Sequence, residues 1–151
     1  MTSSRAIRQA ATGEAQLLEE LQRRSSDVWE EYREQLAANP DVIELPQTFI
    51  EQGWVRVAVG DDGEPIGFSV VIPTDDQVHE LDGLFVEPDH MRCGVGRALV
   101  QDAAARAARA GAERLEVTAG PAQGFYEKLG FVVVGAAQTR FGPAVRMCRR
   151  T

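Results

Sequence analysis

The segment LFVEPDHMRCGVGRAL, from Leu84 to Leu99, decides the fold of this chain. It begins with β-prone residues, reaches Pro88, which ends a strand, and passes through a glycine-bearing turn into a pattern typical of a helix. A strand that leads directly into a long helix indicates a crossover to a parallel neighbour, because antiparallel strands need only a short turn. The segment therefore predicts an α/β fold.

The flanking sequence supplies the other elements. We expect strands at residues 6–8, 54–59, 66–72, 78–86, 114–118, 131–134 and 144–149. We expect helices that open at residues 12–14, 25–27, 94 and 121, while residues 43–52 are ambiguous, with Pro46 suited to the first turn of a short helix. This order predicts a single domain over residues 1–151, with a mixed, mostly antiparallel central sheet of six to seven strands flanked by helices on both faces.

Composition excludes several functions. Hydrophobic residues make up 44% and charged residues 26%, as in ordinary globular proteins. The net charge of −7 argues against a nucleic-acid surface, which needs a basic stripe. No apolar run approaches the roughly 20 residues that span a membrane, and the N-terminus lacks the apolar region of a signal peptide. We therefore expect a cytoplasmic protein that binds neither nucleic acid nor membrane.

The cysteines and histidines give no sign of a metal site. Cys93 and Cys148 form no CxxC pair, and His79 and His90 stand apart from them without a recognisable ligand spacing. Cys93 precedes a helix, where a thiol can become reactive, but no Cys-His arrangement supports a nucleophile. We expect no metal, and we interpret Cys93 as a small residue in a turn.

The turn Cys93-Gly94-Val95-Gly96-Arg97 is a candidate phosphate site. A helix N-terminus presents unpaired N–H groups and a partial positive charge, and glycine lets the backbone approach a pyrophosphate closely. Arg92 and Arg97 offer charge-assisted contacts. The pattern is neither a P-loop nor a dinucleotide fingerprint, since Leu99 occupies the last glycine position. Taken alone, these residues fit a phosphate cradle or simply a tight strand–helix turn.

From Leu84 onward the sequence resembles the acyl-CoA-binding motif of the GNAT acetyltransferase superfamily. That motif is a strand ending in V-x-P, then Arg/Gln-x-x-Gly-x-Gly/Ala, then a helix. The matching residues are Val86, Pro88, Met91, Gly94, Gly96 and Arg97-Ala98-Leu99. A second signature, F-Y-x-K-L-G-F, matches residues 125–131, and the resemblance extends roughly from residue 54 to residue 147.

Two residues depart from the family pattern. Met91 stands where members usually carry Arg or Gln, and Ala119 stands where many carry Asn. Either change could weaken a contact to the cofactor. A CoA-binding or regulatory module without transferase activity is therefore the alternative to an enzyme.

The resemblance implies an N-acetyltransferase that moves an acetyl or short acyl group from acetyl-CoA to a primary amine by direct attack. It implies that the pantetheine arm lies where the strands at 78–86 and 114–118 splay apart, held by backbone N–H groups near Leu84–Val86. The implied cofactor-binding residues are Leu84, Phe85, Val86, Met91, Arg92, Cys93, Gly94, Val95, Gly96, Arg97 and Ala98.

The resemblance also assigns catalytic roles. Tyr126 corresponds to the family's leaving-group tyrosine and is expected to be the general acid, although a packed aromatic residue is the alternative. Glu80 matches a glutamate that serves as base in some members. Asp82 shares its strand face unless Gly83 supplies a bulge, so the choice between the two carboxylates, or water alone, stays open. His79 should point to the opposite face.

The sequence does not identify the acceptor of the acyl group. A small-molecule amine, a peptide N-terminus and a lysine side chain all fit the implied chemistry. Trp29, Tyr32 and Trp54 are candidates for an acceptor wall, but ordinary packing is the preferred interpretation of all three. A homodimer is possible, since dimers are common among similar proteins.

Overall fold

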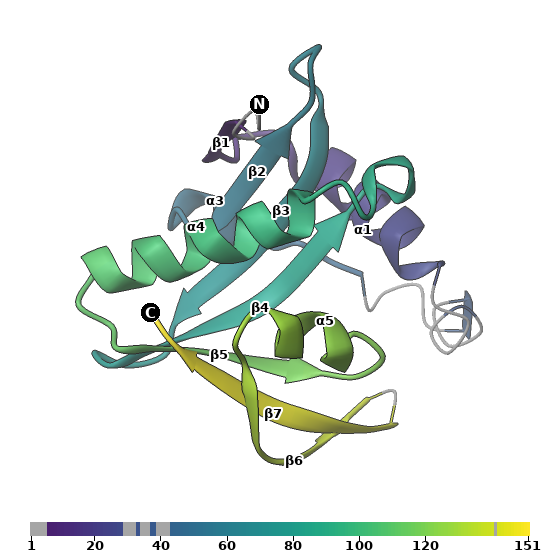
Figure 1. Cartoon of the computed structure of the whole chain (residues 1–151). Helices are drawn as coiled ribbons and strands as arrows, with labels where there is room; N and C mark the ends of the chain where they lie inside the picture. Colours follow the sequence, from purple (N-terminus) through teal and green to yellow (C-terminus); the bar gives the residue numbers. More distant parts are fainter. Residues whose placement is uncertain (1–5, 29–32, 34–36, 39–42, 141) are drawn as a thin grey trace. The chain divides into compact units, whose positions relative to one another are not determined.

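The structure is a computed structural model of the 151-residue chain, and it describes residues 6–28, 33, 37–38, 43–140 and 142–151. Within these ranges the strands are β1 (Ala6–Gln9), β2 (Val55–Val59), β3 (Pro65–Pro73), β4 (Val78–Val86), β5 (Arg114–Ala119), β6 (Val132–Thr139) and β7 (Gly142–Arg150). The helices are α1 (Ala15–Ser26), α3 (Gln47–Glu51), the 3-10 turn η2 (Pro88–His90), α4 (Val95–Arg109) and α5 (Gln123–Lys128) (Figure 1).

The seven strands of the described ranges form one sheet in the order β1-β2-β3-β4-β5-β7-β6. The β1·β2, β2·β3, β5·β7 and β6·β7 pairs are antiparallel, and β4·β5 is parallel. A parallel pair requires a crossover, which α4 supplies between β4 and β5. The prediction of a mixed, mostly antiparallel sheet of six to seven strands flanked by helices is confirmed.

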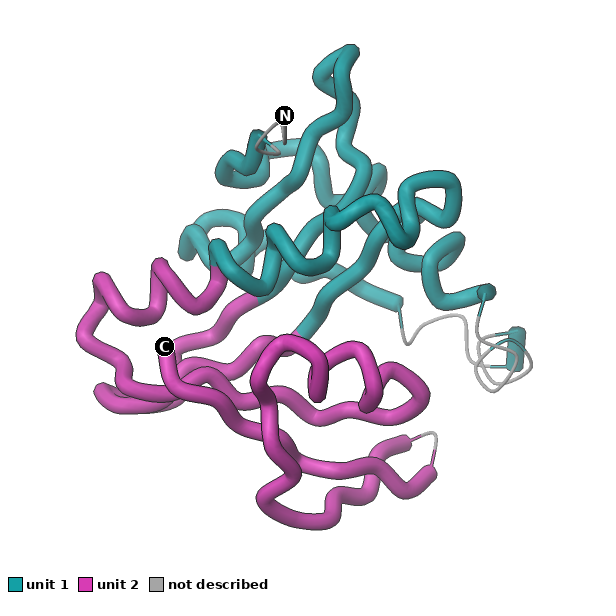
Figure 2. Tube along the Cα trace, in the orientation of Figure 1, with its two compact units in different colours: residues 1–70, 83–102 teal, residues 71–82, 103–151 magenta. Residues whose placement is uncertain are grey.

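The chain divides into two compact units, each assembled from two separate stretches of sequence (Figure 2). Unit 1 contains residues 1–70 and 83–102, and unit 2 contains residues 71–82 and 103–151. The division falls inside β4, after Asp82, and inside α4, after Asp102. Each unit has buried apolar residues of its own.

The core of unit 1 includes the first half of α4. Val95 and Leu99, one helical turn apart, join Ala58 and Ile66 in one buried cluster. Gly67 permits this packing, because a Cβ there would lie 3.0 Å from both the Phe85 carbonyl oxygen and the Val95 side chain. The start of α4 is therefore fixed tightly against the strands of unit 1.

Helix α1 extends further than the sequence predicts. We expected residues 25–27 to begin a second helix, but α1 continues to Ser26, and the Asp27 N–H bonds to the Arg23 carbonyl. Ser25 is buried, and its hydroxyl accepts a hydrogen bond from the Val86 N–H at 3.2 Å. That serine makes a tertiary contact, so its assignment as a helix cap was wrong. Trp29, Tyr32 and Leu36 of the predicted second helix lie outside the described residues.

The strands of unit 2 bury one face. Leu115, Val117 and Ala119 are buried in β5, while the residues that alternate with them point to the other side. Met147 of β7 pairs with Val117 and is fully buried on the same face. The opposite face of these strands is polar, with residues 114, 116 and 118 of β5 on it.

Strand β6 is longer than the predicted 131–134. It continues through Gly135, Ala136 and Ala137, which are weak strand formers, because each of them pairs with a residue of β7. As the last strand in the sheet order, β6 is an edge strand. Val132, Val133 and Val134 on it are 62%, 46% and 59% exposed.

Candidate active site

The segment between β4 and α4 folds as a strand, a turn and a helix within unit 1. Pro88 opens η2 directly after β4, and Met91 follows in extended conformation. The first hydrogen bond of α4 runs from the Ala98 N–H to the Gly94 carbonyl, at 3.0 Å. The N–H groups of the first helical turn precede that bond and have no carbonyl one turn earlier, an arrangement that favours an anion.

Two residues of this turn adopt left-handed backbone conformations, Arg92 with φ 65° and Gly94 with φ 83°. Such a φ costs a non-glycine residue about 1–2 kcal/mol, so the surrounding structure holds Arg92 there. A Cβ added to Gly94 would meet no atom within 4 Å, which leaves the space before the helix open. A pyrophosphate group fits a cradle of this kind.

Three side chains around the turn are exposed: Arg92, Cys93 and Arg97. Neither arginine forms an ion pair with any residue in the described ranges, so both guanidinium groups can contact phosphate oxygens. Met91 is partly buried and contributes no charge. The cradle therefore consists mainly of backbone, with two cationic side chains beside it.

Helix α1 holds the end of β4. Arg24 donates from Nε and Nη2 to both oxygens of Glu87, at 2.5 and 2.8 Å, and this hydrogen bonding lowers the pKa of Glu87. The Val86 N–H is already bonded to Ser25. The predicted backbone contact of residues 84–86 with the pantetheine arm therefore depends on Leu84 and Phe85. The Leu84 side chain packs against the buried cluster that contains Val95 and Leu99, and the Phe85 ring packs against the Phe68 ring.

A charged cluster of four side chains lies on the polar face of unit 2. Arg146 of β7 donates from Nη1 to Glu80 at 3.1 Å and to the Thr118 hydroxyl at 2.7 Å, and from Nη2 to Glu116 at 2.6 Å. The strand register explains the contact, since Glu80 pairs with Glu116 and Thr118 pairs with Arg146. The charged cluster thus joins β4, β5 and β7, and it contains one predicted catalytic residue.

Asp82 and His79 flank Glu80 on β4. Partial desolvation of this exposed carboxyl, and then the nearby Glu80 carboxylate, raise the pKa of Asp82. Since Glu80 acts on it electrostatically and Leu81 between them is buried, the two carboxylates share the polar face. His79 pairs with Leu115 on the other side, as expected. The pairing of β4 with β5 ends at Leu81 and Val117, just before Asp82.

Tyr126 lies on α5 and is 7% exposed. Its ring meets Phe125 and Phe131 edge-on, at centroid distances of 5.1 and 5.4 Å. Arg149, which pairs with Leu115, places its guanidinium 5.9 Å from the Phe131 ring. Tyr126 therefore packs on the buried face of the unit 2 strands, opposite the charged cluster.

Sequence reasoning missed four residues that shape these two regions: Ser25, Glu116, Thr118 and Arg146. The alternation of polar and apolar residues over 114–119 does signal that Glu116 and Thr118 share a face. Nothing local signals that Arg146 lies across from them, because strand register between distant segments sets that contact.

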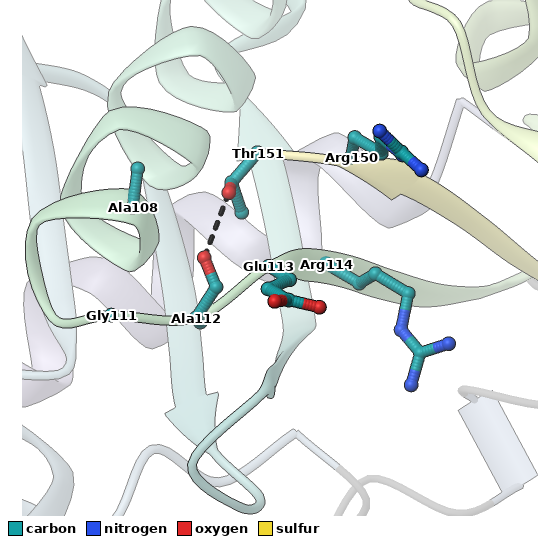
Figure 3. A pocket seen from close by; sticks show the side chains of 7 residues that line it. All are labelled: Ala108, Gly111, Ala112, Glu113, Arg114, Arg150 and Thr151. Atoms are coloured by element: carbon teal, nitrogen blue, oxygen red, sulfur yellow. Dashed lines mark hydrogen bonds between the residues drawn. The ribbon is translucent and has the colours of Figure 1, made fainter.

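A cleft of about 580 Å³ in unit 2 lies apart from these residues (Figure 3). It is lined by Ala108, Gly111, Ala112, Glu113, Arg114, Arg150 and Thr151. The Thr151 hydroxyl donates to the Ala112 carbonyl at 2.8 Å beside it. None of the predicted site residues lines this cleft.

Within the described ranges, no group of His, Cys, Asp and Glu side chains is arranged to hold a metal ion. Cys93 and Cys148 are thiols. Of the helices in the described part of the chain, none has both the length and the apolar character needed to cross a bilayer.

A crossover helix that follows a left-handed glycine turn in a mixed sheet is an arrangement that favours an anion at its first turn. Residues 15–131 match the model of the acetyltransferase (GNAT) family. The chain belongs to the GNAT family, which confirms the resemblance found in the sequence. In the matched range, the family model includes both the β4–α4 turn and Tyr126.

The curated relatives of this chain also carry acetyltransferase names. Peptidyl-lysine N-acetyltransferase YjaB of Escherichia coli K12 is 33% identical over 108 residues, which cover 72% of this chain but only 65% of that protein. YjaB of Salmonella typhimurium LT2 is 31% identical over 132 residues, 87% of this chain and 86% of that protein. Among solved structures, PaiA N-acetyltransferase of Thermoplasma acidophilum, determined with coenzyme A, has a TM-score of 0.79 at 21% identity, covering 99% and 100% of the two chains. This last match supports the fold.

Proposed function

We propose that this chain is an N-acetyltransferase that transfers an acetyl group from acetyl-CoA to a primary amine by direct attack. The observation that supports this most strongly is the turn before α4, with its open helix N-terminus and left-handed Gly94, in a chain of the GNAT family. The alternative, a module that binds CoA without turnover, is less well supported, because the curated relatives are named as acetyltransferases.

The acyl donor is proposed to bind at residues Leu84, Phe85, Val86 and Met91–Ala98. The N–H groups of the first turn of α4 bind the pyrophosphate, and Arg92 and Arg97 add charge-assisted contacts. Acetyl-CoA supplies an activated thioester to this site. The backbone supplies most of the cradle, so the uncharged Met91 is compatible with binding.

Tyr126 is proposed as the general acid. Direct attack by an amine expels a thiolate, and a phenol can deliver a proton to it. In the tetrahedral intermediate the attacking nitrogen and the leaving sulfur are different atoms on one carbon, so the acid and the base can be different residues. Tyr126 packs against the buried face of the unit 2 strands and Glu80 lies on their polar face, so the proposed acid and the proposed base are separate groups.

Glu80 is proposed as the general base, with Asp82 as its competitor. An acceptor ammonium must lose a proton before its nitrogen can attack, and a carboxylate can take that proton directly or through water. Glu80 is held in place by Arg146, whereas the raised pKa of Asp82 suits a base. Comparison of Glu80→Gln with Asp82→Asn separates the two.

The proposed acceptor is a lysine side chain in a peptide, with a small amine as the alternative. The charged cluster contains two carboxylates and one guanidinium, and Asp82 adds a third carboxylate beside it. Arg114 and Arg150 on the same face pair two positions further along the strands, so carboxylates outnumber the guanidinium at Glu80 itself, which favours a cationic ammonium group. The name of the relatives, peptidyl-lysine N-acetyltransferase, points to the same class of acceptor.

Two measurements test the proposed function. Acetyl-CoA at 100 times its Kd should stabilise the protein by about 2.7 kcal/mol, a rise in melting temperature of roughly 5–10 °C. CoA release should then be measured with an N-terminally blocked lysine peptide, its lysine-to-arginine counterpart and small amines. No thermal shift would exclude the cofactor site. A shift without CoA release from any acceptor would favour the regulatory alternative.

We also propose that the protein forms a homodimer through β6. Edge strands normally carry charges that prevent self-pairing, yet β6 carries none, and three exposed valines adjoin its unpaired edge. In a chain of net charge −7, an uncharged strand is where two copies meet with least repulsion. Sedimentation equilibrium of wild type and Val133→Lys tests it, with Leu17→Lys, equally exposed at 46%, as the control. Equal masses for all three proteins would exclude this interface.

Finally, we propose that residues 1–151 act as one domain in the cytoplasm. The chain passes three times between the two units, which favours unfolding as one cooperative transition. Equal calorimetric and van't Hoff enthalpies would support a single domain, and two resolved transitions would exclude it. The two cysteine thiols suit a reducing compartment.

A further inference from the structure

Resting on the proposed function, we propose that Arg146 is a positioning residue that holds the Glu80 carboxylate ready to accept the acceptor's proton. Arg146 comes from β7, far from Glu80 in sequence, and belongs to neither of the segments that carry the family signatures. Two of its three hydrogen bonds lead to side chains on the adjacent strand β5, and the third reaches the proposed base, Glu80, on the next strand, β4.

The Arg146 guanidinium lies closer to its partners on β5 than to Glu80. Thr118 Oγ1 and Glu116 Oε2 lie 2.7 and 2.6 Å from Arg146, closer than Glu80 Oε1 at 3.1 Å. Thr118 pairs directly with Arg146 across the β5·β7 ladder. Glu116 and Thr118 therefore anchor Arg146, and Arg146 in turn orients Glu80.

Only one oxygen of the base is engaged. The Arg146 guanidinium donates to Oε1 of Glu80. Within the described ranges, no side chain or N–H group donates to Oε2. The side chains of Arg146 and Glu80 are 34% and 27% exposed, so solvent and an incoming amine can reach them. This leaves Oε2 as the oxygen that receives the proton.

The charge balance around Glu80 explains why a cation is needed. Asp82 from β4, Glu116 and Arg114 from β5, and Arg146, Cys148 and Arg150 from β7 are the ionisable side chains on the same face. Arg146 is the cation that contacts Glu80, and the two glutamates, Glu80 first, raise the pKa of Arg146. Removing it would leave Glu80 charged beside two carboxylates, which makes Glu80 easier to protonate.

A purely structural role makes a different prediction. If Arg146 only joined the three strands, its loss would lower the melting temperature and leave the pH dependence of turnover unchanged. If it positions the base, the acid limb of the kcat/KM profile moves to higher pH, because the base then loses its negative charge at a higher pH.

The test is a double-mutant cycle between Arg146→Gln and Glu80→Gln, read as kcat/KM against pH. In the wild-type background we expect Arg146→Gln to lower kcat at least roughly 10-fold near neutral pH and to move the acid limb up by about 1 pH unit. In the Glu80→Gln background, the same substitution should change kcat by less than about 2-fold. Arg146→Lys, which keeps the charge but not the fork of donors, should keep the limb near its wild-type position.

Arg150→Gln is the matched control, because it removes one positive charge from the same strand and face as Arg146, and Glu80 is hydrogen-bonded to Arg146 instead. This variant should leave both the acid limb of the kcat/KM profile and kcat unchanged. If Arg146→Gln fails to fold, Thr118→Val removes one anchor of Arg146 and should move the limb in the same direction by less.

The outcomes separate the two proposals. Normal turnover by Glu80→Gln would remove the base and with it the role of Arg146. Slow turnover by Glu80→Gln, with an unmoved acid limb in Arg146→Gln, would overturn the positioning role and leave the proposed function intact. Additive losses in the cycle would also overturn it, because they would show that Arg146 acts independently of Glu80.

Discussion

The turn at the start of α4 and the charged cluster meet the same requirement, the placement of charge, with different parts of the chain. The turn belongs to unit 1 and is one short run of sequence whose backbone provides the donors. The charged cluster belongs to unit 2 and takes its side chains from three strands that only the fold brings together. The first depends on backbone conformation and the second on side-chain charge.

This difference predicts how each region responds to change. Backbone N–H groups keep their dipoles at any pH, so the turn should tolerate most side-chain substitutions except those that disturb its left-handed residues. The charged cluster consists of titratable groups, so its function should follow pH closely. Binding should therefore fail through backbone changes in unit 1, and chemistry through side-chain changes in unit 2.

The largest expected effect is the loss of chemistry without loss of binding in Tyr126→Phe. General acid catalysis contributes about 10²- to 10⁴-fold, so kcat should fall within that range. Acetyl-CoA affinity should stay within about 2-fold, because the ring contacts with Phe125 and Phe131 do not involve the hydroxyl. Rapid-quench turnover and calorimetric titration measure the two quantities. Unchanged turnover would show that Tyr126 serves packing alone.

The converse variant is Gly94→Ala, which should lose binding and keep chemistry. A left-handed conformation costs alanine about 1–2 kcal/mol, so we expect acetyl-CoA affinity to fall roughly 10-fold if the bound turn keeps that conformation. The pH profile of kcat at saturating acetyl-CoA should not move. Titration of the donor, followed by turnover at saturation, measures both effects.

Gly111→Ala is the control for that substitution. Gly111 has φ 92°, follows α4 at its other end and, like Gly94, has no atom within 4 Å of an added Cβ. Gly111→Ala should lose stability in urea unfolding and keep its affinity, whereas Gly94→Ala should lose affinity. Equal affinity in the two variants would show that the turn does not hold the cofactor.

The smallest expected effect concerns Asp82, whose pKa is raised in the folded protein. A raised carboxyl pKa gives stability that is fully present below the unfolded value, near 3.9, and is lost as pH rises through the folded value. Asp82→Asn should therefore be more stable than wild type at pH 7.5, by under about 2 °C, with the difference shrinking towards pH 4. Thermal unfolding at the two pH values measures it, with exposed Asp76→Asn as the control. A pH-independent difference would contradict the prediction.

The sequence predicted the turn well and the charged cluster poorly, for a physical reason. Pro88, Gly94 and the apolar spacing of α4 act locally, so strand, turn and helix were all found. Ser25 looked like a helix cap because serine commonly serves as one, yet its partner is the Val86 N–H, 61 positions away in the chain. The contact of Arg146 with Glu80 spans 66 positions and depends on strand register, which no short pattern encodes.

The division of the chain also bears on its synthesis. Unit 1 has all of its residues once Asp102 has been added, and the ion pair of Asp102 with Arg56, at 3.0 Å, is among the last contacts it gains. Unit 2 is complete only once β7 has been added, because residues 71–82 are translated well before their partners on β5 and β7. A chain cut short after residue 102 would therefore contain the residues proposed to bind the cofactor without the strands and helix proposed to complete the chemistry.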